Sequence, residues 1–238
     1  MSKSPTGVET TLAFIARDDD AAEAGLLAAC RDTPGLRAWK ALPRELLGPS
    51  PQGAAGPGAH YDLVLEAIGA AAADRLAVAL AAAEGLDRAR SRAFVGTAYE
   101  IVPGGGDVAL FCPLVRLGHL TPAGFQRYWL DVHADFGRRN PVNAYRQIHP
   151  REAVTPAGLP NAPFDGVAQA LFADLPAMQA RQQAMSDVLR KDEAVQNVSS
   201  FVGAGTVNPT LNSGRLTIVL KPLGQRDDIT TVMRRLKD

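Results

Sequence analysis

The sequence predicts an α+β fold in which two related halves pack as an intramolecular pseudo-dimeric α/β barrel. Strand-like and helical runs alternate in the order β-α-β-β-α-β over the first hundred residues, and the pattern restarts after "PGGGD" at 103–107. Two landmarks also repeat at nearly the same spacing. "YDLV" at 61 matches "FDGV" at 164, and "RSRAFVG" at 90 matches "NVSSFVG" at 197. These three observations indicate a tandem repeat.

The first half, residues 8–103, contains four strand-like runs and two helical runs. Its first helix is expected to begin at an aspartate and to stop near Pro34 and Gly35. The Pro/Gly/Ala-rich segment 47–59 is expected to be a loop. The expected elements are a strand at 10–17, a helix at 19–35, a weak strand at 37–43, a strand at 61–69, a helix at 71–86 and a strand at 91–103.

The second half, residues 108–207, follows the same order. Its first helix should begin after Thr121, a good N-cap, with Pro122 in the first turn, and should run to about Asn140, because Pro141 follows. The other expected elements are a strand at 108–117, an extended segment at 143–154, a loop at 155–163, a strand at 164–173, a helix at 175–194 and a strand at 197–207.

Each half should lay two helices over one face of a four-stranded antiparallel sheet, which leaves the other face uncovered. Pairing the two sheets face to face would bury both uncovered faces. This packing is the reason for expecting a pseudo-dimeric barrel within one chain.

The tail, residues 208–238, lies beyond the second half and predicts a strand at 215–221, a Pro-Leu-Gly turn and a helix that begins near Asp228. Such a unit is too small to fold alone. The sequences "NPTLNSGRLTIVLKPL" and "VMRRLK" resemble part of the porter domain of resistance–nodulation–division efflux pumps, over about 206–238. The sequence offers none of the transmembrane helices that a pump requires, so a recombined gene end explains this resemblance better than transport.

Composition excludes several classes of protein. Lys+Arg and Asp+Glu balance at 25 each, so neither nucleic acid nor a membrane surface is an expected partner. The two cysteines, Cys30 and Cys112, lie far apart, which makes a disulfide framework or a zinc site improbable. The N-terminal residues contain no apolar signal region. A cytoplasmic protein without metal or other cofactor is therefore expected.

The segment "HLTPAGFQRYWLDVHADFGRRNP" at 119–141 carries the main candidate for chemistry. Phe125, Trp129, Val132 and Phe136 follow helical spacing and predict an apolar stripe, with His133 at its edge. From periodicity alone, His133 is either a hydrogen-bonded core histidine or a functional one. Partial desolvation beside a large ring would favour a neutral imidazole, which can accept a proton from a bound organic acid.

The same residues carry a resemblance to a known family. "FQRYWLDVHADFGRRNP", then "NAYRQIHP", "FDGVAQALFADLPAMQA" and "RKDEA" resemble, in order, the landmarks of the EthD family. The first half is similar mainly through "YDLVLEAIG" and reads as a degenerate copy without the tryptophan and histidine.

The resemblance implies ferredoxin-like halves of the dimeric α/β barrel superfamily and a cleft for a small aromatic or hydrophobic molecule. It implies His133 as the candidate base, with Tyr128 and Trp129 shaping the cleft. The other residues expected to bind substrate are Phe125, Tyr145 and His149.

Three functions remain open at this point. The first is cofactor-free acid–base chemistry (decarboxylation, dehydration or cyclisation) on an aromatic or polyketide-like molecule, using His133. The second is a non-catalytic accessory or binding protein associated with catabolic monooxygenase pathways. The third, and least favoured, is an assembly or porter-derived fragment. We expect either a monomer, as a pseudo-dimer, or a homodimer.

Overall fold

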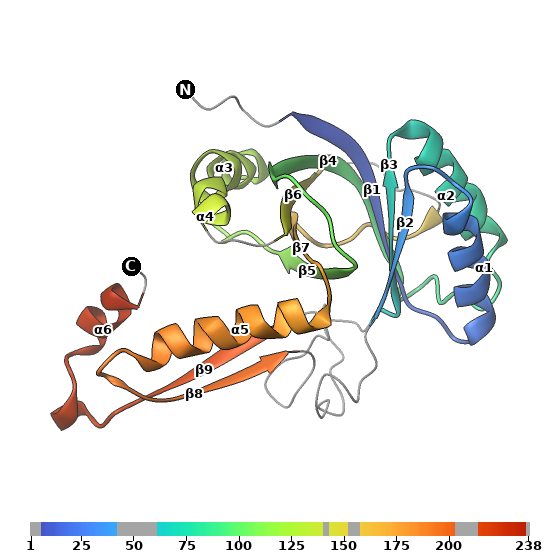
Figure 1. The fold of residues 1–238 in the computed structure, drawn as a ribbon. Coiled ribbons are helices and arrows are strands. Elements are labelled where there is room, and N and C mark those ends of the chain that lie inside the picture. Colours follow the sequence, from blue (N-terminus) through green and yellow to red (C-terminus); the bar gives the residue numbers. More distant parts are fainter. Residues whose placement is uncertain (1–5, 42–60, 140–142, 152–157, 203–213, 237–238) are drawn as a thin grey trace.

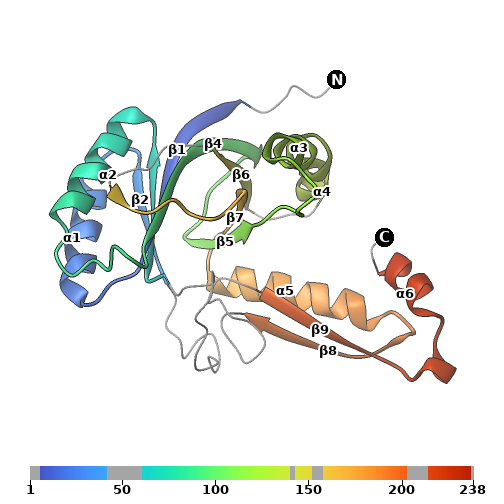
Figure 2. The ribbon, with the colours of Figure 1, turned by 180° about the vertical axis from the view of Figure 1, so that it is seen from behind.

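A computed structural model of the protein describes residues 6–41, 61–139, 143–151, 158–202 and 214–236. It contains a curled antiparallel sheet of seven strands, a separate two-stranded hairpin, and helices packed against both (Figures 1 and 2). The predicted α+β barrel-like fold is confirmed. Within these residues, no helix is both long and apolar enough to cross a membrane.

The first repeat is a complete β-α-β-β-α-β unit. Its strands lie in the order β2-β3-β1-β4, and α1 and α2 cover one face. Leu26, Leu76 and Leu80 of the helices are buried against Ile15 and Leu65 of the sheet. The weak strand predicted at 37–43 is present as β2. The elements are β1 (Gly7–Ile15), α1 (Asp20–Arg31), β2 (Leu36–Lys40), β3 (Leu63–Ile68), α2 (Ala70–Ala82) and β4 (Arg92–Val102).

The second repeat contributes three strands to the same sheet, in the order β6-β7-β5. The helix predicted after Thr121 is present, and it contains a π-helical turn, η2, in its middle. The elements are β5 (Val108–Leu114), α3 (Pro122–Tyr128), η2 (Trp129–His133), α4 (Ala134–Arg139), β6 (Ala144–Pro150), β7 (Gly166–Phe172) and α5 (Leu175–Arg190).

The repeated Asp landmark has the same structural role in both halves. In the first repeat, the Asp62 carboxylate accepts a hydrogen bond of 3.0 Å from the backbone N–H of Arg17 and pairs with its guanidinium. In the second, Asp165 accepts a bond of 2.8 Å from the backbone N–H of Arg116 and pairs with that side chain. In each half, an aspartate just before the third strand therefore contacts an arginine just after the first strand.

The two repeats join through β4 and β6, which pair antiparallel with Thr97 opposite His149. The sheet then curls, and its concave face buries a core drawn from both repeats. Phe14 of β1 lies at the centre, with its ring centroid 6.4 Å from that of Phe111 and 5.5 Å from that of Phe164. The two halves thus share one curled seven-stranded sheet, rather than forming the two separate four-stranded sheets that were predicted.

A polar group lies on the same concave face. Glu66 of β3 is fully buried and forms an ion pair with Arg146 of β6. Arg146 also donates a hydrogen bond of 2.9 Å to the side-chain oxygen of Gln169 on β7. Because β3 and β6 are not neighbours in the sheet, this pair links the two repeats across the interior.

The fourth strand of the second repeat departs from the expected pairing. β8 (Val195–Val202) does not join β5 but pairs antiparallel with β9 (Gly214–Leu220) of the tail. The strand and helix predicted for the tail are present as β9 and α6 (Ile229–Arg235), with a short 3₁₀ turn, η4 (Leu223–Gln225), between them. Arg235 of α6 pairs with Asp192 just before β8, so α5, β8, β9 and α6 form an arm on one side of the sheet (Figure 1).

Candidate functional site

The helix that follows Thr121 has a side-chain N-cap at its start and a π-helical turn in its middle. The Thr121 hydroxyl accepts a hydrogen bond of 3.1 Å from the backbone N–H of Gly124, and Pro122 occupies the first turn. The π-helical turn then shifts the angular position of every later side chain relative to an ideal α-helix. As a result Trp129 is buried, whereas Val132, expected on the same stripe, is 53% exposed. The side chain of Phe136 lies outside the described part.

Trp129 anchors an aromatic stack against the sheet. Its ring lies parallel to the imidazole of His149 on β6, with centroids 4.8 Å apart and planes 8° apart. Phe125 also stacks on the indole, with ring centroids 5.7 Å apart, and Tyr99 of β4 meets His149 edge-on at 4.9 Å. Gly166 at the start of β7 lies beneath the indole, where a Cβ atom would overlap the ring. The stack therefore brings together three of the predicted residues: Phe125, Trp129 and His149.

A hydrogen-bonded glutamine holds the stack in register. Gln147 donates from Nε2 to the backbone carbonyl of Trp129 at 3.0 Å, and its Oε1 lies 3.3 Å from Nε2 of His149. Because the glutamine oxygen can only accept, His149 carries its proton on Nε2. Burial lowers the pKa of His149 to about 4, so this imidazole is neutral at pH 7.

Tyr145 lies beside this network on β6. It is half-buried, and burial raises the pKa of its phenol, while the side chains of Gln147 and Trp129 act in the opposite direction. The indole N–H of Trp129 is buried, has no hydrogen-bond partner in the described part of the chain, and lowers the pKa of Tyr145. Tyr145 and the stack therefore form one cluster beneath the helix.

The other two predicted residues lie on the outer side of the helix. Tyr128 is 62% exposed, and His133 is exposed at the end of the π-helical turn. The two histidines predicted for the site, His133 and His149, therefore lie in different environments. His149 is enclosed by aromatic rings, and His133 faces outward.

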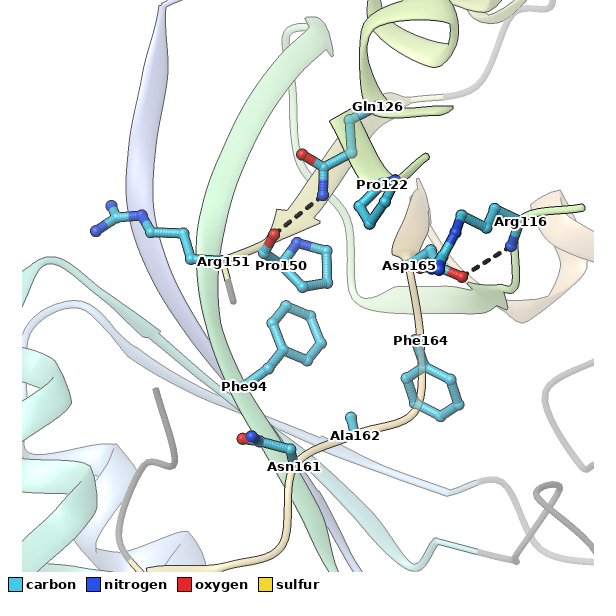
Figure 3. Close-up of a pocket in the computed structure, with 10 residues that line it drawn as sticks. All are labelled: Phe94, Arg116, Pro122, Gln126, Pro150, Arg151, Asn161, Ala162, Phe164 and Asp165. Carbon is cyan, nitrogen blue, oxygen red and sulfur yellow. Dashed lines mark hydrogen bonds and ion pairs between the residues drawn. The ribbon is translucent and has the colours of Figure 1, made fainter. Parts of the chain in front are cut away.

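A pocket of about 240 Å³ opens next to the cluster, where the start of α3 meets the ends of β6 and β7 (Figure 3). Its lining is mixed, with apolar rings and prolines on some sides and polar or charged side chains on the others. None of the six predicted site residues lines it. The lining residues are Phe94, Arg116, Pro122, Gln126, Pro150, Arg151, Asn161, Ala162, Phe164 and Asp165.

The charged groups of this pocket are held in ion pairs. Arg116 pairs with Asp165 through Nη1 and donates from Nε to the carbonyl of Leu120 at 2.9 Å. Its Nη2 has no partner among the described residues. Arg151 turns away from the pocket and pairs with Glu9 at 2.9 Å (Figure 3). Arg116 therefore keeps one nitrogen, Nη2, that can donate a hydrogen bond to a bound group, while its charge is paired with Asp165.

The pocket and the aromatic cluster share a wall. Gln126, next to Phe125, donates from Nε2 to the carbonyl of Pro150 at 3.0 Å, and Pro150 follows His149 (Figure 3). One sequence motif noticed earlier lies at the pocket: "FDG" at 164–166, which matches "YDL" at 61–63. Phe164 forms a wall, Asp165 holds Arg116, and Gly166 supports Trp129.

No group of three or more His, Cys, Asp or Glu side chains that could hold a metal ion occurs in the described ranges. Comparison with family models adds one finding. A model of the EthD domain matches residues 118–197, from just before α3 to the start of β8, and so covers the aromatic cluster and eight of the ten residues that line the pocket. This part of the chain is similar to the EthD domain, in agreement with the predicted resemblance.

Proposed function

We propose that this protein binds a small aromatic or polyketide-like molecule with an acidic group in the pocket between α3 and the concave face of the sheet. The observation that carries the proposal is a pocket whose lining combines apolar rings with a guanidinium that has one N–H group left to donate. Phe94, Phe164 and Pro150 surround the space, and Nη2 of Arg116 has no partner among the described residues (Figure 3). Small-molecule sites typically combine apolar walls with a few fixed polar groups of this kind.

The size and charge of the pocket support a ligand of this class. A space of about 240 Å³ is small and suits a compact molecule with one or two rings better than an extended chain. Arg116 is oriented by Asp165 and by the Leu120 carbonyl, so little side-chain entropy is lost when a carboxylate or phenolate binds. The EthD match, residues 118–197, supports this region as the functional part of the chain, although Arg116 and Phe94 lie outside it.

The test uses benzoate and naphthoate, their neutral amides, and isothermal titration calorimetry. Arg116→Gln should weaken carboxylate binding by about tenfold while leaving amide binding nearly unchanged, since a charge-assisted hydrogen bond contributes about 1.5–3 kcal/mol. Arg17→Gln is the matched control, because Arg17 makes the equivalent contacts with Asp62 in the first repeat and does not line the pocket. Equal losses in the two variants, or no binding of any probe, would contradict the proposal.

A second candidate function is cofactor-free acid–base catalysis by His133, and the π-helical turn favours it. π-helical turns inside α-helices often occur at functional sites. This turn ends at His133. His133 does not line the pocket, so this role concerns a molecule bound at the outer side of the helix.

His133→Ala tests the catalytic role. The side chain is exposed, so the melting temperature should stay close to that of wild type. Loss of a general base would lower turnover by about 10²–10⁴-fold. Turnover is followed by mass spectrometry on aromatic acids and polyketide-like phenols. Binding by wild type without any chemical change would favour a non-catalytic accessory protein instead.

A further inference from the structure

The curled sheet has two free edges, and the internal repeat shows what belongs between them. β4, the fourth strand of the first repeat, pairs with β1 of its own repeat and with β6, the second strand of the other repeat. By the same relation, the fourth strand of the second repeat would pair with β5 and with β2. These are the two end strands of the seven-stranded sheet.

The two free edges face each other across the open side. Trp39 of β2 meets Phe111 of β5 edge-on, with ring centroids 6.0 Å apart, although the two strands share no ladder. Among the described residues, the buried indole N–H of Trp39 has no hydrogen-bond partner. The same residues leave the outer backbone edges of β2 and β5 without a strand partner.

Within one chain, β8 is kept away from this position. In both views α5 lies between the β8–β9 hairpin and the curled sheet (Figures 1 and 2). The turn into α2 uses Gly69 with φ of +81°, and α2 folds back over its own sheet. The turn into α5 uses Asp174, an extended N-cap with φ of −153°, and α5 leads into the arm.

Charge indicates which free edges fit together. The sheet ends at β2 and β5, and the hairpin leaves one free edge on β8 and one on β9. β2 carries Arg37 and Lys40, and β9 carries Arg215, which are the kind of residues that protect an edge from pairing. β5 (VALFCPL) and β8 (VQNVSSFV) contain no charged residue.

We propose that β5 of one copy pairs with the free edge of β8 in a second copy, and that the reciprocal contact closes a two-fold symmetric dimer. Each chain supplies one β5 edge and one β8 edge, so the contact is self-complementary and does not propagate into a fibre. Main-chain hydrogen bonds supply the affinity, as in other cases of strand addition. Pro113 of β5 cannot donate a backbone hydrogen bond, so pairing is centred on 108–112.

The first test measures mass and hydrogen exchange of the full chain. Light scattering after size exclusion should show a dimer that dissociates on dilution. As the dimer forms, amide exchange should slow in 108–114 and 195–202 and stay unchanged in 36–40 and 214–220. A monomer at every concentration overturns the proposal, as does slower exchange confined to β2 or β9.

The second test compares two lysine variants at positions that face each other in the hairpin. Asn197 of β8 and Val219 of β9 are paired and both exposed. Asn197→Lys should raise the dimer dissociation constant at least about tenfold, because each dimer contains the contact twice and a lysine disfavours edge pairing. Val219→Lys should change it less than about twofold.

Equal effects of the two variants would overturn the proposal. Circular dichroism checks that each variant is folded. If Asn197→Lys is not, Gln196→Lys replaces it, because Gln196 is exposed at the bulge between Val195 and Asn197 and should raise the dissociation constant in the same way.

Discussion

His149→Phe should remove a pH dependence from the stability of the protein. Phenylalanine keeps a planar ring between Trp129 and Tyr99 but cannot be protonated. In the wild-type protein, burial lowers the pKa of His149 from 6.5 to about 4. Below pH 6.5 the unfolded chain therefore binds a proton that the folded chain does not, and wild-type stability falls as the pH falls.

The size of this effect follows from the two pKa values. Between pH 7 and pH 5 the linkage relation gives a loss of about 2 kcal/mol in the unfolding free energy of wild type from this one residue. The loss approaches about 3 kcal/mol near pH 4 and then levels off. Acidic residues titrate in both proteins, so the difference between wild type and variant isolates the imidazole.

Urea unfolding at pH 7, 6 and 5, followed by tryptophan fluorescence and circular dichroism, measures this difference. Wild type should lose about 2 kcal/mol more than His149→Phe over that interval. Parallel stability curves for the two proteins would refute the buried neutral state of His149. An NMR titration of the His149 ring protons gives an independent check, since they should not titrate near pH 6.5.

The remaining predictions concern packing and the buried ion pair. Gly166→Ala should lower the unfolding free energy by about 1–3 kcal/mol, because the new methyl group overlaps the Trp129 ring, while Gly105→Ala, which meets nothing within 4 Å, should be nearly neutral in thermal unfolding. Glu66→Gln should cost about 3–5 kcal/mol by leaving Arg146 buried without its partner. Glu9→Gln, which breaks the half-exposed pair with Arg151, should lower the unfolding free energy by at most about 1 kcal/mol in the same urea titration. Similar losses for Glu66→Gln and Glu9→Gln would show that burial of the ion pair does not decide how much its loss destabilises the protein.

Local sequence patterns were sufficient to predict most strands and helices of the sheet. Runs of alternating or continuous apolar residues fix β1, β3, β4 and β7, and the Thr121–Pro122 start fixes the helix that follows. The partner of β8 could not be predicted in this way. A strand has the same residue pattern whether it pairs with β5 or with β9, so the choice depends on where α5 directs the chain.

The site was predictable to a similar extent. The family-like motifs identified Trp129 and His149, and the structure stacks them against each other. The outward position of Val132 could not be read from spacing, because a 4-3-4 pattern assumes an α-helix and the π-helical turn breaks that period. The pocket was missed because its lining comes from short segments at the ends of separate elements, and only the Phe164–Asp165 pair belonged to a motif noticed in the sequence.

The neutral state of His149 has a consequence for ligand selection. The wall shared through Gln126 and Pro150 places the imidazole near the pocket, yet an uncharged ring cannot attract an anion. Charge selection must then come from Arg116, because arginine side chains are not deprotonated in proteins. Carboxylate affinity should therefore be nearly constant from pH 7 to pH 5, while stability falls over the same range. If affinity rises towards pH 5 instead, a histidine becomes charged on binding, and the arginine alone does not account for recognition.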